Sequence, residues 1–538
     1  MKSKTLKIHP SDNIGVALVD LPSGERIADG EINLVLVDDI PQKQKFALED
    51  MEVGSLVYMY GILVGSTTRK VSKGGLISTQ NLIHKTHKTT KKLSSHQWDP
   101  PEINHWKEKT FMGYHRDDGQ VGTDNIWLFF PLVFCENRNI QVLRKTFERE
   151  FHPIKKEPLQ QLLGSLLHPN RDSHESVFTE FLPHEYQNIK VRFIIHHGGC
   201  GGTREDARVL ASLLAGYVHN PNVAGASVLS LGCQNLEIKT FEEELKKLDP
   251  KRSKPVLIFN QQSEGSTNQF LSKIIRETFS HLVEANKIKR RSSPLSKLKI
   301  GLECGGSDGF SGITANPVLG QVSDVVSSLG GSVILSEFPE LCGVEQELAN
   351  RCVDDLLANK FIHLMEKYEA SAQRVGSGFD MNPSPGNIKD GLITDAIKSA
   401  GAVKKSGNSP VTDVLDYTEY ASKSGVSLLC TPGNDVESTT GLAGGGANII
   451  LFTTGLGTPT GNPISPVIKV SSNSELAKKM EDIIDFDAGT IISEGKSLGA
   501  VGDELLDLVI QIASGSIKTK AEILGQQDFI PWKRGVSL

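Results

Sequence analysis

The sequence predicts an α/β protein in which a parallel sheet follows a small all-β module. Two observations support this prediction. Short apolar runs separated by turn residues fill residues 1–92, which is typical of a compact β module. Further along, apolar runs of strand length alternate with segments long enough for a helix, and this alternation favours parallel strands.

The elements follow in order along the chain. The stretch from His84 to Trp106 is basic, polar and proline-containing and has few aliphatic residues, so a linker is expected there, with bounds at 93–106. Apolar runs that end in polar or glycine-rich turns predict strands at Val191–Ile195, Ser227–Leu231, Val256–Phe259, Leu298–Leu302, Ser332–Leu335, Leu428–Leu429 and Ile449–Phe452. Helices are expected at Gln141–Phe151, Gln160–Leu167, Arg204–Tyr217, Phe241–Leu248, Ser266–Ala285 and Val344–Tyr368.

The composition indicates a soluble globular protein of several domains. The chain has 538 residues, of which 38% are hydrophobic and 23% are charged. Its formal net charge of -6 argues against nucleic acid as a partner, and no apolar run has membrane-spanning length. The start lacks an apolar signal region and the seven cysteines form no CxxC pair, so we expect a cytoplasmic protein without disulfides.

The most distinctive stretch is GLECGGSDGFSG at residues 301–312. Its glycines let backbone N–H groups approach an anion, while Glu303, Cys304 and Asp308 offer hard and soft metal ligands. A tight turn around a buried structural cysteine is the alternative for this stretch taken alone.

Other expected strand ends carry similar side chains. His196 and Cys200 follow one strand, and Cys233 and Glu337 follow two others. Because the carboxyl ends of parallel strands meet at one edge of a sheet, these groups are candidates for a shared site. A mixed nitrogen, sulfur and carboxylate set suits iron(II), manganese or zinc.

Three loops offer groups for an anionic or hydroxylated ligand. YHRDDGQV presents Arg116, NPSPGN at 382–387 precedes Lys398, and ESTTGLAGGGAN at 437–448 offers hydroxyl and N–H groups at an expected helix start. A plain connecting loop is the alternative for each. The absence of a GxxxxGK[ST] string counts against a nucleotide-binding function.

Taken together, the motifs resemble those of the altronate and galactarate dehydratase family of sugar-acid lyases. In chain order they are YHRDDGQVGTDN, HHGGCGG, LGCQN, GLECGGSDGFSGITANP, SEFPE, NPSPGN, CTPGNDVESTTGLAGGGAN and FTTGLGTPTGN. The resemblance runs almost from end to end and includes the N-terminal module, which is similar to a SAF-type β-clip domain.

The resemblance implies an organisation and an activity. It implies a β-clip domain at 1–92, a second α/β domain at 107–290 linked to homodimer formation, and a Rossmann-like metal-binding domain at 291–538. The expected reaction is the loss of water from a sugar acid, with D-altronate going to 2-dehydro-3-deoxy-D-gluconate and iron(II), or manganese, as the cofactor. Galactarate is the competing substrate.

The resemblance also assigns roles to candidate residues. The expected metal ligands come from His196, Cys200, Cys233, Cys304, Asp308 and Glu337. Arg116, Asn387 and Asn448 are expected to contact substrate carboxylate and hydroxyl groups. Either Lys398 or His197 is expected to be the general base.

The sequence departs from the family pattern in two places, and other functions compete. Many relatives have a His-x-His-Asn string where this chain has Ser78–Asn81, and the lysine that usually follows NPSPGN is Ile388 here. The competing hypotheses are an iron–sulfur dehydratase, a sulfolactate sulfo-lyase and a non-catalytic sugar-acid sensor. Widely spaced cysteines disfavour an iron–sulfur cluster.

Overall fold

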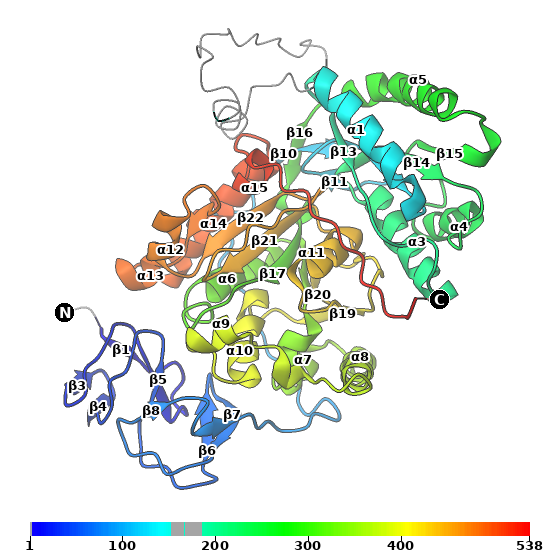
Figure 1. Ribbon diagram of the computed structural model, residues 1–538. Coiled ribbons are helices and arrows are strands. Elements are labelled where there is room, and N and C mark those ends of the chain that lie inside the picture. Colours follow the sequence, from blue (N-terminus) through cyan, green and yellow to red (C-terminus); the bar gives the residue numbers. More distant parts are fainter. Residues whose placement is uncertain (1–2, 152–165, 167–185, 538) are drawn as a thin grey trace. The chain divides into compact units, whose positions relative to one another are not determined.

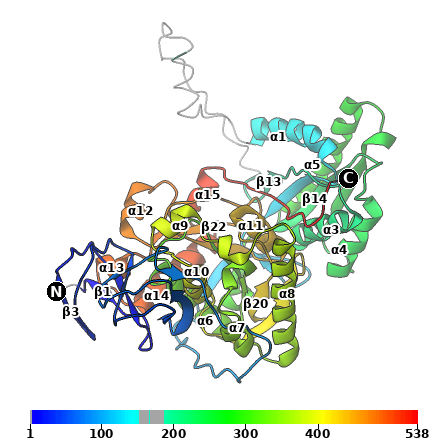
Figure 2. The same cartoon turned by 60° about the horizontal axis from the view of Figure 1, so that its bottom comes forward.

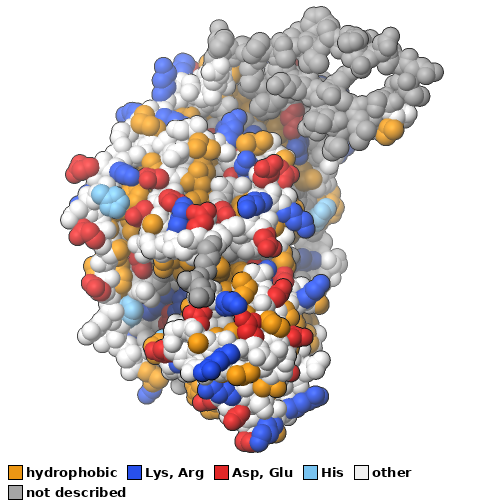
Figure 3. Space-filling model, turned by 90° about the vertical axis from the view of Figure 1, so that its left-hand side faces the viewer, with side chains coloured by type: hydrophobic (Ala, Val, Ile, Leu, Met, Phe, Trp, Pro, Cys, Tyr) orange, Lys and Arg blue, Asp and Glu red, His pale blue; other side chains and the backbone are white. Residues whose placement is uncertain are grey.

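The computed structural model describes residues 3–151, 166 and 186–537, and the chain forms two compact units. The first unit comprises Met1–Asp124 and Arg291–Trp532, and the second comprises Asn125–Arg290 and Lys533–Leu538. On the face shown in Figure 3, acidic and basic side chains are interspersed rather than gathered by sign.

The N-terminal module is built of short antiparallel strands, as predicted. Its sheets have the orders β1-β2-β5-β8, β3-β4 and β6-β7-β9. The strands are β1 (Thr5–Leu6), β2 (Ile14–Ala17), β3 (Arg26–Asp29), β4 (Ile32–Val35), β5 (Lys45–Ala47), β6 (Leu56–Met59), β7 (Ile62–Thr67), β8 (Leu76–Ile77) and β9 (Leu82–Ile83). Tyr60 and Gly61, with φ of 58° and 79°, make the tight turn between β6 and β7, a conformation that matches the twist of a hairpin.

A parallel sheet of seven strands forms the centre of the first unit (Figure 1). Its order is β19-β20-β18-β17-β21-β22-β23, and every neighbouring pair is parallel. The strands are β17 (Lys299–Cys304), β18 (Ser332–Leu335), β19 (Val411–Leu415), β20 (Gly425–Leu429), β21 (Ile449–Thr454), β22 (Val467–Ser471) and β23 (Phe486–Asp487). The chain builds outward from β17 in one direction and restarts at β21 in the other, so a topological switch point lies between these two strands.

Helices cover both faces of this sheet, which explains why strands such as β18 and β21 are mostly apolar on both faces. The helices α6 (Ala315–Ser328) and α14 (Leu498–Ala513) share one hydrophobic cluster with β17, β18 and β21. On the other face, α11 (Asp435–Gly444) and α15 (Lys520–Ile523) share a second cluster with the same sheet. The first unit also contains the helical segments η5 (Phe338–Leu341), α7 (Glu345–Arg351), α8 (Asp355–Gln373), η6 (Phe379–Met381), α9 (Pro385–Lys389), α10 (Asp395–Ala402), η7 (Val403–Ser406), α12 (Ser474–Lys479) and α13 (Thr490–Ser493).

The N-terminal module shares a hydrophobic cluster with α10. Leu392, Ile393, Ala396 and Ile397 pack with buried side chains of the module, and α10 lies beside β7 (Figure 1). Figure 2 again shows α10 next to the blue ribbon of the module. A short antiparallel sheet of the same unit, in the order β11-β10-β16, contains β10 (Thr110–His115), β11 (Val121–Gly122) and β16 (Arg291–Pro294).

The second unit contains its own parallel sheet, in the order β13-β12-β14-β15. Its elements are β12 (Ile126–Pro131), α1 (Asn137–Phe151), β13 (Lys190–Phe193), α3 (Arg204–His219), β14 (Val223–Ser230), α4 (Ile238–Leu248), β15 (Val256–Asn260) and α5 (Thr267–Asn286). Thr203 and Ser266 begin α3 and α5 with capping boxes, which satisfy backbone N–H groups that would otherwise lack partners.

The α/β class, the small all-β module and the large parallel sheet are confirmed. The segment Val344–Tyr368 forms two helices, α7 and α8, rather than one. The break comes after Arg351, because Cys352 forms an isolated backbone β-bridge with Val411 and the Asp354 side chain caps the start of α8. The predicted helix at Gln160–Leu167 lies outside the described residues apart from Leu166. In the described part of the chain, no helix is both long enough and apolar enough to cross a membrane.

Candidate active site

The candidate site lies at the carboxyl edge of the seven-stranded sheet, where turns after three neighbouring strands meet. Cys304 is the last residue of β17, Glu337 follows β18, and Asp435 begins α11 after β20. This edge, beside the switch point, is where open α/β sheets bind their ligands.

A thiol, two carboxylates and an ammonium group form the buried centre of the site. Lys405 Nζ donates hydrogen bonds to Cys304 Sγ at 2.8 Å and to Glu337 Oε2 at 2.6 Å. The Cys304 thiol donates to Glu340 Oε2 at 2.8 Å. Burial, with the two carboxylates adding to it, raises the pKa of the Cys304 thiol well above its usual value, so this cysteine is a thiol and not a thiolate.

Glu337 is held in a strained backbone conformation that directs its carboxylate into the centre. Its φ of 66° lies in the left-handed region, which a residue with a side chain seldom adopts. The backbone N–H of Glu337 donates to Thr431 Oγ1 at 2.8 Å, and its Oε2 accepts from Cys304 N at 3.0 Å. Strain of this kind persists only where the surrounding structure enforces it, and it concentrates at functional sites.

Glu303 and Glu337 form a carboxyl pair that holds a proton. Glu303 Oε2 accepts from Ser438 Oγ at 2.6 Å and from Ser336 Oγ at 3.0 Å, whereas its Oε1 and Glu337 Oε1 are buried with no conventional donor among the described residues. Burial, followed by repulsion from Glu337, raises the pKa of Glu303 well above its ordinary value, and the two side chains are hydrogen-bonded to each other. A protonated Glu303 donating to ionised Glu337 satisfies both oxygens.

A second ammonium group lies on the other side of Glu340. Lys398 Nζ lies 2.5 Å from Glu340 Oε1 and donates to Asn382 Oδ1 at 2.9 Å. Burial alone would lower the pKa of Lys398, but the attraction of Glu340 outweighs it and holds that pKa above its ordinary value. For Glu340, burial is outweighed by the attraction of Lys398 and Lys405, which lowers its pKa. The lysine is therefore an ammonium and Glu340 a carboxylate at neutral pH.

Asp435 is the group of this site that titrates near neutrality. Burial raises its pKa to about 7, and the Glu337 and Glu340 carboxylates add to the shift. Asp435 is only half-buried and lies against the backbone of Gly305, where an added Cβ would come 2.1 Å from Asp435 Oδ2. The glycine after Cys304 is therefore required for the carboxylate to reach this position.

The Cys304 centre contains suitable metal ligands, but the Lys405 ammonium group already hydrogen-bonds to two of them. Ligand atoms of Cys304, Glu337 and Glu340 lie within 4.8 Å of one another, a soft and hard set of the kind that holds iron(II). Lys405 Nζ bridges two of these ligands, and a divalent ion beside it would meet a repulsion of several kcal/mol. The arrangement thus fits the Lys405 ammonium rather than a metal ion, and iron(II) or manganese at this point stays a prediction.

Asp308 lies outside this cluster and accepts hydrogen bonds from a different set of groups. Lys43 Nζ from the N-terminal module lies 2.9 Å from Asp308 Oδ2, and Ser472 Oγ donates to Oδ1 at 2.7 Å. Asn473, Ser311 and the backbone of Phe310 also donate to this fully buried carboxylate. Asp308 therefore links the GGSDG turn to the N-terminal module.

Replacing Asp308 by asparagine is expected to lower the free energy of unfolding by about 3 kcal/mol, since an amide nitrogen would face the donors that now surround the carboxylate. Urea-induced unfolding measures the change. Asp390→Asn is the matched control, because Asp390 lies 4.0 Å from the same lysine but is partly exposed, so less than about 1 kcal/mol is expected. Equal losses in the two variants would refute the linking role of Asp308.

The three residues predicted to bind substrate all make structural hydrogen bonds. Asn387 Oδ1 caps α9 and its Nδ2 donates to Ser307 O at 2.7 Å, so it supports the GGSDG turn. Asn448 accepts from Lys299 N at 2.9 Å and donates to Val121 O at 3.0 Å, which places it at the amino edge of the sheet, opposite Cys304. Arg116 follows β10, which pairs with β11; it is buried, and burial lowers its pKa to about 10. The predicted substrate contacts of these three residues stay predictions.

The other predicted ligands belong to the second unit, at the carboxyl edge of its own sheet. His196 Nε2 donates to Pro131 O at 2.7 Å and its Nδ1 accepts from Gly198 N at 3.1 Å, so both ring nitrogens are used. Burial lowers the pKa of His196 to about 4, which keeps the ring neutral. His197, Cys200 and Cys233 are exposed. Their roles as base and as ligands shared with Cys304 stay predictions.

Sequence reasoning missed four residues of the site. Glu340 and Asp435 stand in SEFPE and CTPGNDVESTT, and the presence of two carboxylates in each of these motifs is a usable signal. Asn382 opens NPSPGN, whose last asparagine was chosen instead. Lys405 lies in an ordinary basic pair, Lys404–Lys405, and nothing local distinguishes it from a solvated lysine.

Models of protein families match almost the whole chain. The Altronate/galactarate dehydratase SAF domain matches residues 3–85, the second domain of D-galactarate dehydratase/Altronate hydrolase matches residues 113–286, and the C-terminal D-galactarate/Altronate dehydratase model matches residues 295–537.

Three curated relatives align over nearly their full lengths. An altronate dehydratase of Escherichia coli is 32% identical over 99% of both chains, and one of Bacillus subtilis is 34% identical over 95% of both. A galactarate dehydratase (L-threo-forming) of Escherichia coli is 29% identical over 97% of this chain and 94% of its own.

Proposed function

Since the chain belongs to the altronate and galactarate dehydratase family and is a sugar-acid hydro-lyase, we propose that it converts D-altronate to 2-dehydro-3-deoxy-D-gluconate. The choice of altronate follows the relatives with the higher identities, 32% and 34% against 29% for the galactarate enzyme. Galactarate is the second candidate substrate. A homodimer and a cytoplasmic location stay predictions.

The observation that supports this reaction is the pairing of buried ammonium groups with a carboxylate whose pKa is near 7. A proton alpha to a carboxylate is weakly acidic, because its removal puts a second negative charge on the substrate. Fixed cations beside the developing enediolate lower that barrier. Lys398 supplies such a cation 2.5 Å from Glu340, at the edge where Asp435 stands.

In the proposed first step, Asp435 takes the proton from C2 of the sugar acid. A base with a pKa of about 7 is ionised in a large fraction of molecules at neutral pH and is still strong enough to accept a proton. Lys398, whose raised pKa keeps it protonated, is better suited to hold the substrate carboxylate than to act as the base.

In the second step, the C3 hydroxyl leaves as water. The electron pair left on the enediolate forms the C2–C3 double bond, and the C3–O bond breaks as the protonated Asp435 returns its proton to the departing oxygen. The resulting enol tautomerises to the 2-keto acid. Asp435 is then ionised again and Lys398 has remained an ammonium, so both groups are ready for the next substrate.

The proposal is tested by incubating the full chain with a panel of hexonates and hexarates and measuring 2-keto-3-deoxy acid. The expected result is product from D-altronate at a kcat/KM at least tenfold above that for galactarate. A higher value with galactarate would assign the second candidate. Binding of altronate without any 2-keto acid, in protein with and without added iron(II), would support a sensor and overturn the enzyme.

Asn382 is expected to contact the substrate. Its Oδ1 accepts from Lys398, while its Nδ2 is buried and has no hydrogen-bond partner among the described residues. Asn382→Ala is therefore expected to raise KM about tenfold, the effect of losing one or two hydrogen bonds. Steady-state kinetics measure it against the exposed Asn408→Ala as control, and an unchanged KM would exclude the contact.

A further inference from the structure

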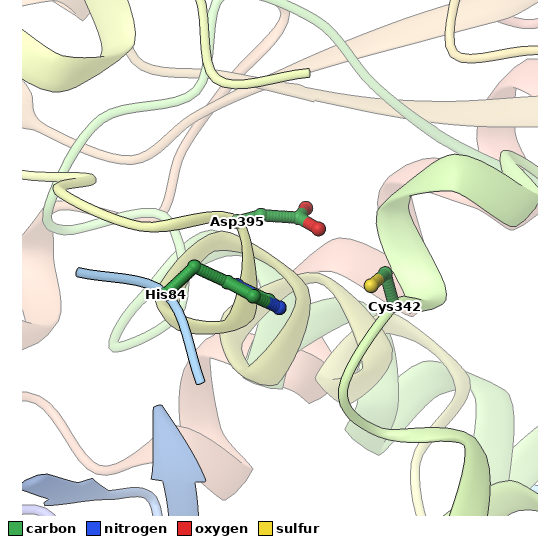
Figure 4. Close-up of side chains that lie close together, drawn as sticks. All are labelled: His84, Cys342 and Asp395. Atoms are coloured by element: carbon green, nitrogen blue, oxygen red, sulfur yellow. The ribbon is translucent and has the colours of Figure 1, made fainter. Parts of the chain in front are cut away.

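We propose that His84, Cys342 and Asp395 bind a divalent transition-metal ion, with zinc the best chemical match. One ligand atom from each side chain lies within 4.8 Å of the other two. The imidazole, thiol and carboxyl groups point toward a shared space (Figure 4). Nitrogen, sulfur and oxygen donors in this combination are those of protein zinc sites, and three such ligands leave one position for water.

The ligand atoms lack the partners that buried polar groups normally have. His84 Nδ1 and both carboxylate oxygens of Asp395 are buried and have no conventional hydrogen-bond partner among the described residues, and Asp395 is only 2% exposed. The Cys342 thiol, a weak donor, is the group that hydrogen-bonds the Asp395 carboxyl. Leaving such groups unsatisfied costs about 1–3 kcal/mol each, and a shared cation would remove that cost.

In the part of the chain that the structure describes, no ammonium group bridges these ligands, in contrast to the Cys304 centre. Lys398 is the cation nearest in sequence to Asp395, and its Nζ is committed to Glu340 and Asn382. At the Cys304 centre, Lys405 bonds to two of the three candidate ligands. The described residues form two groups of three candidate ligands, and His84, Cys342 and Asp395 are therefore the group better suited to a metal ion.

The three ligands come from segments far apart in the sequence. His84 follows β9, the last strand of the N-terminal module, Cys342 directly follows η5, and Asp395 is the first residue of α10. Between them, Gly343 has a φ of 92°, and an added Cβ would come 2.7 Å from Thr86 and 3.2 Å from Ala396. This close approach holds the three segments together around the ligands.

A metal ion at this position would cross-link the module to both segments that carry site residues. The segment before Cys342 supplies Glu340, and the helix after Asp395 supplies Lys398. The ion would thus fix the spacing of this ion pair without touching the substrate. Its binding does not depend on which sugar acid the enzyme uses.

The test is a cobalt(II) titration of the full chain after chelator treatment, followed by absorbance. We expect one equivalent of cobalt to give a near-ultraviolet thiolate charge-transfer band and visible bands typical of tetrahedral cobalt. Cys342→Ser should lose the charge-transfer band, and His84→Ala and Asp395→Asn should bind cobalt at least about tenfold more weakly. His87→Ala, an exposed histidine three residues along the same segment, should bind as the wild type does.

Cys304→Ser decides between the two ligand groups. The charge-transfer band is expected to persist in this variant. If the band were lost in Cys304→Ser and retained in Cys342→Ser, the metal would be assigned to the Cys304 centre instead. Absence of the band in the wild type would refute a cobalt-binding thiolate site altogether. If Cys342→Ser fails to fold by circular dichroism, the half-buried His84 gives the same test, and unchanged cobalt affinity in His84→Ala would overturn the proposal.

Discussion

Replacing Lys405 by methionine is expected to lower the free energy of unfolding by about 3–5 kcal/mol and to reduce turnover at least about a hundredfold. The ammonium group is 1% exposed and neutralises Glu337, whose carboxylate is fully buried. Without it, Glu337 would stay charged and buried without its counter-ion, or would take up a proton, and either outcome disrupts the site. Chemical denaturation and the 2-keto acid assay measure the two effects.

The control for this change is the preceding residue. Lys404 lies 3.5 Å from Glu347, and both side chains are about one-third exposed, so Lys404→Met should change stability by less than about 1 kcal/mol. The double variant Lys405→Met/Glu337→Gln should recover part of the lost stability, because it removes the unpaired charge. A single variant as stable and active as the wild type would contradict the assignment of Lys405 as the cation of the centre.

Replacing Asp435 by asparagine is expected to lower kcat about 10²- to 10⁴-fold, the usual contribution of a general base. The wild-type rate should fall as the pH drops below about 7, since protonation removes the base. Asparagine cannot titrate, so this acidic limb should vanish from the residual activity. Initial rates measured across the pH range test both statements.

Glu437 provides the matched control for Asp435. It lies in the same first turn of α11, and burial likewise raises its pKa above the ordinary value. Glu437→Gln should therefore keep both the rate and the acidic limb. If Asp435→Asn retained the limb near pH 7, another group would be the base, and Asp435 would serve only to shape the turn.

Much of the fold could be predicted from local patterns. Buried parallel strands such as Ser332–Leu335 are short apolar runs between glycine-rich turns, and tertiary packing reinforces that pattern. In the two parallel sheets, the strands β12, β19, β22 and the two-residue β23 were missed. In β19 and β22, polar residues such as Thr412 and Lys469 interrupt the apolar run, whereas β12 is apolar but follows closely on a hairpin.

The site was predictable only in part, because its residues meet through the sheet rather than through sequence spacing. Cys304 ends β17 and Glu337 follows the neighbouring strand β18, so both lie at the carboxyl edge of the sheet, where parallel strands bring such residues together. Lys405 comes from a 3-10 turn after α10 and reaches the centre through packing that no local pattern records. Asn448 stands in a glycine-rich loop of the sequence, but it directly precedes β21 and so lies at the amino edge of the sheet, opposite the site.

The hydrophobic cluster that α10 shares with the N-terminal module couples the packing of the module to the position of this helix. Leu392 and Ile397 pack in the core of the module, while Lys398, the next residue, reaches Glu340. A substitution that loosens the module's interior is therefore expected to shift the helix that carries this lysine. Such a change would reach the ion pair of the active site as well as the stability of the module.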